Sequence, residues 1–199
     1  MMAWAQILRR QLNPVIAAIV SAVVLIGMLG YMIQARAAIL REGTEIILKT
    51  SPVDPRDLMR GDYVRLAYDI SVMDGALFKG DWPKQSRLAP VWLTLEPGED
   101  GVASVTSVSL EKPDPGSATA VYLKSQPVWL YESDRGKATS LSLSFGIERY
   151  YVPEGEGLEI EDARNDQRTT VAVRVSEDGE AQIARLMIDG ETLYEEPLY

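Results

Sequence analysis

The sequence predicts a β-rich protein on a membrane anchor: one N-terminal transmembrane α-helix, then an all-β soluble domain. We expect a sandwich or small barrel of about eight to ten short strands. Three observations lead to this fold class. Residues 14–33 form an uncharged apolar stretch of twenty residues. Beyond residue 43, short runs rich in β-branched and aromatic residues alternate with turn signals. Acidic residues are absent from the first 41 positions and abundant afterwards.

The apolar stretch has the length of a membrane-spanning helix. At about 1.5 Å per residue, twenty helical residues cover the roughly 30 Å hydrocarbon layer of a bilayer. Asn13 and Pro14 are typical of an N-cap and a first helical position, and Gly43 is typical of a C-cap. Residues 35–37 (ARA) fit a signal-peptidase site, but signal peptides have a shorter apolar core, so we expect an uncleaved anchor. The predicted division is a short tail (1–13), a helix with its extension (14–42) and one domain (43–199).

Residues around this helix predict its surroundings and orientation. Arg9, Arg10 and the terminal amine slightly outnumber Arg36 and Arg41 on the other side. Because cytoplasmic flanks carry the excess of basic residues, we expect the N-terminus in the cytoplasm and the domain outside it. Small residues also recur four positions apart, a spacing that lets a second membrane helix approach closely; they are Ala17, Ala18, Ser21 and Ala22.

Composition excludes several functions of the domain. All 29 acidic residues lie from Glu42 onward, against 16 of the 20 basic ones, which gives this part a net charge of about −13. Phosphate backbones repel such a domain, so we expect no nucleic acid partner. The chain has no Cys and no His, which removes disulfides, thiol nucleophiles, histidine triads and the common zinc sites. We expect no cofactor and no metal.

The sequence of the domain predicts a series of short strands. Residues 62–71 alternate with period two: Val64, Leu66, Tyr68 and Ile70 share one face. A Glu-Asp-Gly turn at 177–179 separates two further runs, as in a hairpin. The predicted strands lie within residues 45–49, 62–71, 91–95, 102–110, 120–124, 128–131, 141–145, 170–175, 181–188 and 192–194.

The segment before the alternating strand is the most specific. Asp54 and Pro55 predict a capped helical turn, Gly61 ends it, and Asp62 begins the strand. The peptide at 61–68 (GDYVRLAY) matches the GDYxxLxY pattern.

With two further segments, 54–57 (DPRD) and 145–155 (FGIERYYVPEG), the chain resembles the GDYxxLxY family of membrane-anchored bacterial proteins over most of its length. The resemblance implies a bacterial membrane setting, with a multi-spanning membrane protein as partner besides the lipid bilayer. Together with the orientation expected from the flanking arginines, this predicts an inner-membrane protein with its domain in the periplasm. The resemblance names no reaction. The motif and possible binding residues are Asp57, Arg60, Gly61, Asp62, Tyr63, Leu66, Tyr68, Glu148, Arg149, Tyr150, Glu154 and Gly155.

Two readings of the charged residues stay open. The cluster of Arg56, Arg60 and Asp62 can face the cluster of Glu148, Arg149, Glu154 and Glu156, either as structural ion pairs or as a carboxylate–guanidinium binding site. The run 154–162 (EGEGLEIED) holds five acids and suggests calcium, but the D-x-D-x-D-G ligand framework is missing. Arg60-Gly61-Asp62 is explained by the turn better than by adhesion.

No convincing catalytic pair is visible, so the predicted role is a non-catalytic accessory or scaffold that binds a larger membrane protein. A small-ligand or polysaccharide-binding sensor is the alternative, with aromatics at Tyr63, Tyr68, Trp92, Trp129, Tyr150 and Tyr151. A serine–lysine membrane peptidase is the third hypothesis; its serine would be Ser51, and Lys124 is the lysine in an apolar strand context. An exposed apolar patch would favour the scaffold, and a deep pocket lined by Trp92 or Trp129 the ligand.

Overall fold

The computed structural model describes residues 14–52, 63–114, 116–132, 140–153 and 155–197. The chain forms two compact units, Met1–Ala38 and Ile39–Tyr199, which we describe separately. The predicted capped turn at residues 55–60 lies outside the described residues.

One long helix, α2 (Pro14–Glu42), contains the predicted anchor. It is long and apolar enough to cross a membrane, and no residue in its apolar window is buried. A 29-residue helix is about 44 Å long, so it exceeds the roughly 30 Å hydrocarbon layer. The backbone N–H of Gly43 donates to the Ile39 carbonyl at 2.9 Å, which ends the helix where the sequence predicts.

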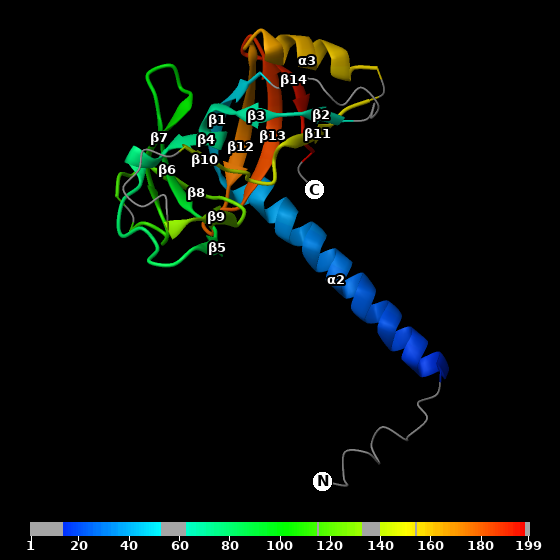
Figure 1. Cartoon of the computed structure of the whole chain (residues 1–199). Coiled ribbons are helices and arrows are strands. Elements are labelled where there is room, and N and C mark those ends of the chain that lie inside the picture. The colour runs from blue at the N-terminus through cyan, green and yellow to red at the C-terminus, as the bar shows by residue number, and fades with distance from the viewer. Residues whose placement is uncertain (1–13, 53–62, 115, 133–139, 154, 198–199) are drawn as a thin grey trace. The chain divides into compact units, whose positions relative to one another are not determined.

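The largest sheet of the second unit has five strands in the order β14-β13-β12-β1-β3 (Figure 1). They are β1 (Thr44–Ser51), β3 (Ala67–Tyr68), β12 (Thr169–Val175), β13 (Ala181–Ile188) and β14 (Glu191–Glu195). Each pairs with its neighbours in antiparallel fashion, and the C-terminal β12 lies beside the N-terminal β1. This long-range pairing joins the two ends of the unit.

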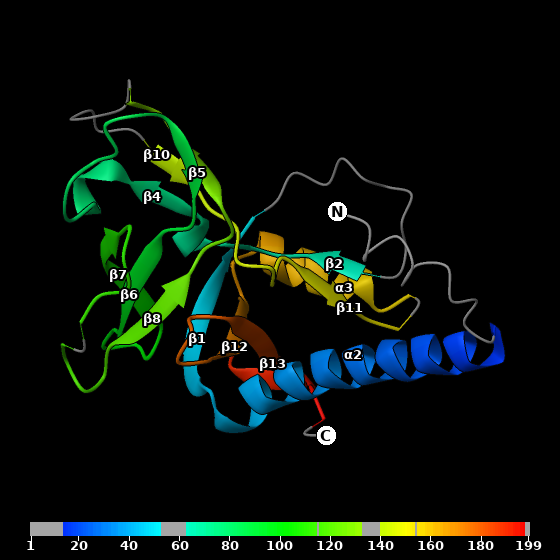
Figure 2. The same ribbon diagram turned by 90° about the horizontal axis from the view of Figure 1, so that it is seen from below.

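Smaller antiparallel sheets complete the β structure (Figures 1 and 2). A three-stranded sheet has the order β7-β6-β8, from β6 (Trp92–Pro97), β7 (Ala103–Ser109) and β8 (Val121–Lys124). Three ribbons pair β2 (Tyr63–Arg65) with β11 (Arg149–Tyr151), β4 (Val72–Asp74) with β10 (Ser140–Ser142), and β5 (Arg87–Ala89) with β9 (Val128–Leu130). Short 3₁₀ turns lie at η1 (Asp69–Ser71) and η2 (Gly75–Leu77).

The fold class is confirmed as an apolar helix before a β-rich domain, with three differences in detail. The described residues contain 14 strands, more than the eight to ten predicted, because several runs break into short pieces. None of the sheets in the described part of the chain closes into a barrel. A helix that the sequence analysis did not predict, α3 (Gly157–Asn165), begins within the acidic run, because Ile160 and Ala163 lie three apart and are both buried.

A single apolar core connects the sheets. Its fully buried members come from every larger element and include Leu48, Val64, Leu66, Leu93, Leu123, Ile160, Val171 and Leu186. The period-two alternation predicted for residues 62–71 is confirmed by the burial of Val64, Leu66, Tyr68 and Ile70. The segment nevertheless serves two sheets, because β2 pairs with β11 while β3 pairs with β1.

Candidate functional site on the motif ribbon

The spacing of the GDYVRLAY peptide has a structural explanation in its second half. Leu66 and Tyr68 are each 1% exposed. The Leu66 N–H donates to the Glu148 carbonyl at 2.9 Å, and the Tyr68 hydroxyl donates to the Ile147 carbonyl at 2.6 Å. These two bonds attach the motif to a segment about eighty residues further along the chain. Leu66 and Tyr68 are therefore positioning residues.

The segment that they hold is a tight turn before β11. Gly146 has φ of +82°, a conformation that glycine adopts without a steric penalty. The Glu148 carboxylate accepts the N–H groups of Phe145 and Gly146, the latter at 2.9 Å. Burial raises the pKa of Tyr68, and the nearby negative charge of Glu148 raises it further. Because its carboxylate accepts the N–H groups of Phe145 and Gly146, Glu148 stabilises the turn.

The ribbon of β2 and β11 has one buried and one exposed face. Val64 and Tyr150 are paired across the strands and both point into the core. On the other side Arg65 lies opposite Arg149, and Tyr63 lies opposite Tyr151. We call these last four residues the Tyr–Arg face.

The Tyr–Arg face is ordered by contacts among its own side chains. The Arg149 guanidinium lies 5.6 Å from the ring centroid of Tyr63, a cation–π distance. The Tyr63 and Tyr151 rings lie 6.0 Å apart and are tilted by 57°. Tyr151 is 71% exposed and is the most exposed aromatic residue of the domain among the described residues. The face therefore presents two guanidinium groups and two aromatic rings to solvent.

Helix α3 packs against strand β2 of the ribbon (Figure 2). Arg164, in its last turn, is only 1% exposed, and its Nη1 donates to the Arg65 carbonyl. Its Nε and Nη2 donate to Asn165 Oδ1 at 3.3 and 3.0 Å. Burial lowers the pKa of Arg164, and the charge of Glu161 opposes this shift. The sequence analysis did not identify Arg164. The available signal was its position four residues after Ile160, in the last turn of a helix, where a basic residue interacts favourably with the helix dipole.

Two further predicted site residues that the structure describes, Tyr150 and Gly155, lie outside the Tyr–Arg face. Tyr150 packs in the core against Tyr194, with ring centroids 6.1 Å apart. Its pKa is raised by burial and by the Glu196 carboxylate. Gly155 has φ of +92° and serves a turn. The others, Asp57, Arg60, Gly61, Asp62 and Glu154, lie outside the described residues, as does Arg56. The predicted facing of the two charged clusters stays a prediction.

Neither Trp92 nor Trp129, the tryptophans named for the ligand hypothesis, lines the hollow bounded by Lys49 and Asp100 or the one bounded by Thr44 and Thr119. The Trp92 ring is contacted by Lys112 and Lys124, whose ammonium groups lie 5.9 and 5.6 Å from its centroid. Gly179 also packs on it, since a Cβ there would come within 2.5 Å of the Trp92 ring. Trp92 is therefore a structural residue at the β12–β13 hairpin turn. Lys124, the lysine of the peptidase hypothesis, packs at the same hairpin turn, against Trp92 and Gly179.

Trp129 is instead part of an exposed apolar strip on β5 and β9. It is 53% exposed, lies directly opposite Leu88, and stacks at 6.2 Å on Tyr131, two residues further along. Leu88 and Tyr131 are 54% and 51% exposed. The strip is the kind of exposed apolar surface that favours the scaffold hypothesis.

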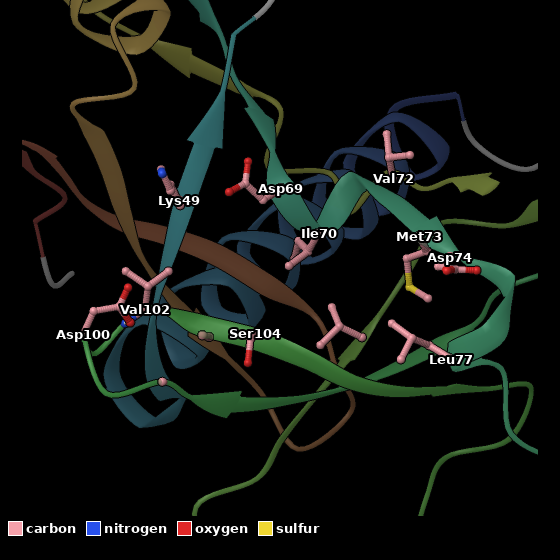
Figure 3. Close-up of a pocket in the computed structure, with 13 residues that line it drawn as sticks. Lys49, Asp69, Ile70, Val72, Met73, Asp74, Leu77, Asp100, Val102 and Ser104 are labelled. Atoms are coloured by element: carbon pink, nitrogen blue, oxygen red, sulfur yellow. The ribbon is translucent and has the colours of Figure 1, made fainter.

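A hollow beside β1, η1 and β4 lies elsewhere on the domain (Figure 3). It measures about 380 Å³, and its charged groups come from Lys49, Asp69, Asp74 and Asp100, beside apolar Ile70 and Met73. The hydroxyl of Ser51, the serine of the peptidase hypothesis, donates to Asp69 Oδ1. No cluster of carboxylates suited to a metal ion occurs among the described residues.

The fold and the site define a class: a β-rich domain that follows a membrane-length apolar helix and exposes an aromatic–arginine face on a motif ribbon. A family model described as GDYXXLXY protein matches residues 25–186, which is most of the chain. The chain belongs to the GDYXXLXY family. The match begins within α2 and covers the motif ribbon and α3. Comparisons with curated proteins and with solved structures found no match.

Proposed function

We propose that this protein is a membrane-anchored, non-catalytic accessory subunit that binds a larger, multi-spanning membrane protein through its helix and its β domain. Its setting is the bacterial inner membrane, with the domain in the periplasm. The Tyr–Arg face carries the proposal, because arginine and tyrosine are enriched where proteins bind one another.

The helix supports the same role. Its apolar side chains are exposed along the whole predicted span, as expected of a segment that is surrounded by lipid or by other helices. Ala17, Ala18, Ser21 and Ala22 give it a face on which a second helix can pack closely. Anchor and domain then offer two separate contacts to one partner, and linked contacts bind more tightly than either alone.

Co-purification of the full-length chain from its native membranes in a mild detergent tests this function. We expect a multi-spanning protein in a fixed ratio to the chain, identified by mass spectrometry, and a particle larger than the monomer by light scattering. A variant with residues 14–33 replaced by leucines keeps an anchor of equal length but lacks the small-residue face. We expect this variant to retain less partner than the parent chain. Recovery of the chain alone, as a monomer, would contradict the proposal.

The sensor hypothesis is the second candidate, because Trp129 and Tyr131 stack on an exposed strand. Exposed aromatic rings of this kind can pack against the apolar faces of sugar rings. If the domain is a sensor, the full-length chain should sediment with insoluble peptidoglycan, and Trp129→Ala should abolish this while Trp4→Ala should not. Equal sedimentation of parent and Trp129→Ala would remove the sensor hypothesis.

A further inference from the structure

We propose that the Tyr–Arg face binds an acidic segment of the partner membrane protein, whose carboxylates pair with Arg65 and Arg149. This inference rests on the proposed accessory function and deepens it: it assigns the domain contact to four residues and gives the chemistry of what they bind.

The first argument is the placement of like charges. Arg65 and Arg149 are directly opposite in an antiparallel pair, where side chains are close and equal charges destabilise the ribbon. A ligand with carboxylates converts the repulsion into attraction.

The second argument is the contrast with other arginines of the domain. Arg174 and Arg185 both pair with Glu45, and Arg168 pairs with Asp166 and Asp189. None of the ion pairs within the described part of the chain includes Arg65 or Arg149. Carboxylates are abundant, with a net charge of about −13 from Glu42 onward. Two adjacent guanidinium groups that form no ion pair with the described residues are complementary to an acidic partner.

The third argument is that the face is held in place before any partner arrives. The ring of Tyr63 restrains the Arg149 guanidinium at 5.6 Å. The backbone under Arg65 is fixed by the buried Arg164, and the Leu66 and Tyr68 bonds fix the register of the whole ribbon. A rigid guanidinium loses little entropy when it forms two parallel bonds to a carboxylate. Leu66 and Tyr68 of the family motif therefore hold this surface in position.

Charge also favours a protein segment over a lipid surface as the ligand. A broad anionic membrane surface would meet the whole acidic domain and be repelled by it. A short acidic peptide brings its carboxylates to the two arginines alone. The flanking rings of Tyr63 and Tyr151 then cover the apolar part of such a peptide, as aromatic residues do at protein interfaces.

Site-specific photo-crosslinking in the full-length chain tests the inference. Benzoylphenylalanine replaces Tyr151 in one version and Val23 of α2 in another, and the chain is irradiated in native membranes. We expect Tyr151→benzoylphenylalanine to cross-link to a partner peptide that contains two or more Asp or Glu residues near the attachment point. A cross-linked peptide without acidic residues, or a cross-linked lipid, overturns the inference.

Charge variants supply the second measurement. Arg65→Glu with Arg149→Glu keeps a like-charge pair on the ribbon but gives it the opposite sign, so we expect at least a tenfold loss of partner retained in mild detergent. Lys79→Glu with Lys84→Glu makes the same change in net charge at two other exposed positions and should lose none. Retention that is equal in the two double variants overturns the inference.

A neutralised arginine keeps the test valid if the double variant fails to fold. Arg65→Gln removes the repulsion, so the midpoint of thermal unfolding should rise while partner retention falls. A merely structural arginine would move both in the same direction, and that result overturns the inference.

The cross-linking arms also separate this inference from the function that it rests on. Capture from Val23 without capture from Tyr151 refutes the Tyr–Arg face and leaves the accessory function standing. Failure of both positions, together with a monomeric chain, refutes the accessory function itself.

Discussion

Tyr68 shows at the scale of one residue how the family motif stabilises the domain. Its hydroxyl donates to the Ile147 carbonyl inside the core, at 2.6 Å. Tyr68→Phe leaves that carbonyl without its partner, so we expect the free energy of unfolding to fall by about 1–3 kcal/mol. Urea denaturation of the detergent-solubilised chain measures this. Tyr131→Phe, at an exposed position, is the matched control and should change stability little; equal losses in both variants would contradict the assigned role.

The same residue makes stability depend on pH. Burial and the Glu148 charge raise the pKa of Tyr68 above the value of about 10 in an unfolded chain. Below pH 10 the phenol is protonated in both states, so its contribution is complete there. Above pH 10 the unfolded state loses its proton first, and the free energy of unfolding falls by up to about 1.4 kcal/mol per pH unit for this group. Between pH 10 and 11.5 the parent chain should lose stability more steeply than Tyr68→Phe; parallel curves would show that Tyr68 does not titrate in this way.

At the scale of elements, the end of α2 and the start of β1 meet at one crowded glycine. A Cβ on Gly43 would lie 2.5 Å from the Ile39 carbonyl oxygen and 3.0 Å from that of Val175, both backbone atoms that cannot turn aside. We expect Gly43→Ala to lower the free energy of unfolding by about 1–3 kcal/mol, as overpacking does. Gly157→Ala is the control, because its Cβ would have ordinary contacts at 3.6 Å and 3.7 Å. Thermal unfolding followed by near-ultraviolet circular dichroism compares the two, and a stable Gly43→Ala would mean that the junction is loose.

The elements also show what the sequence could predict. The long strands β1, β12 and β13 and the hairpin turn at 177–179 were visible, because each has a strong local pattern of burial and turn residues. Helix α3 was hidden by its acidic composition, although Ile160, Ala163 and Arg164 follow helical spacing. The split of residues 62–71 between two sheets could not be predicted, because it depends on pairing with β11 and β1, which are distant in the sequence.

The sequence predicted several residues of the candidate site but not which of them lie side by side. The motif pattern singled out Tyr63, Leu66, Tyr68, Glu148 and Arg149, but alternation alone does not reveal which strand lies beside which. The register of β2 and β11 separates Leu66, Tyr68 and Glu148, which hold the turn, from Tyr63 and Arg149, which face solvent. Arg65 and Tyr151 join the site only through that register.

For the whole molecule, the remaining question is on which side of the membrane the acidic domain lies. Arg9 and Arg10 precede the span closely, and acidic residues contribute little to topology. We therefore expect the N-terminus in the cytoplasm and the domain outside it. Because the chain has no cysteine, one introduced cysteine gives a label without background. In intact spheroplasts a membrane-impermeant maleimide should label Ala118→Cys, at an exposed position of the domain, before lysis.

Gln6→Cys, on the other side of the span, is the matched control and should react only after lysis. The reverse pattern would place the domain in the cytoplasm, where the Tyr–Arg face could bind only cytoplasmic loops of its partner. Those loops carry the excess of basic residues in membrane proteins, which is the wrong charge for two arginines. An extracytoplasmic domain meets loops that lack this excess, so the orientation and the chemistry proposed for the face depend on each other. Labelling of Ala118→Cys therefore tests the acidic-segment inference as well as the topology.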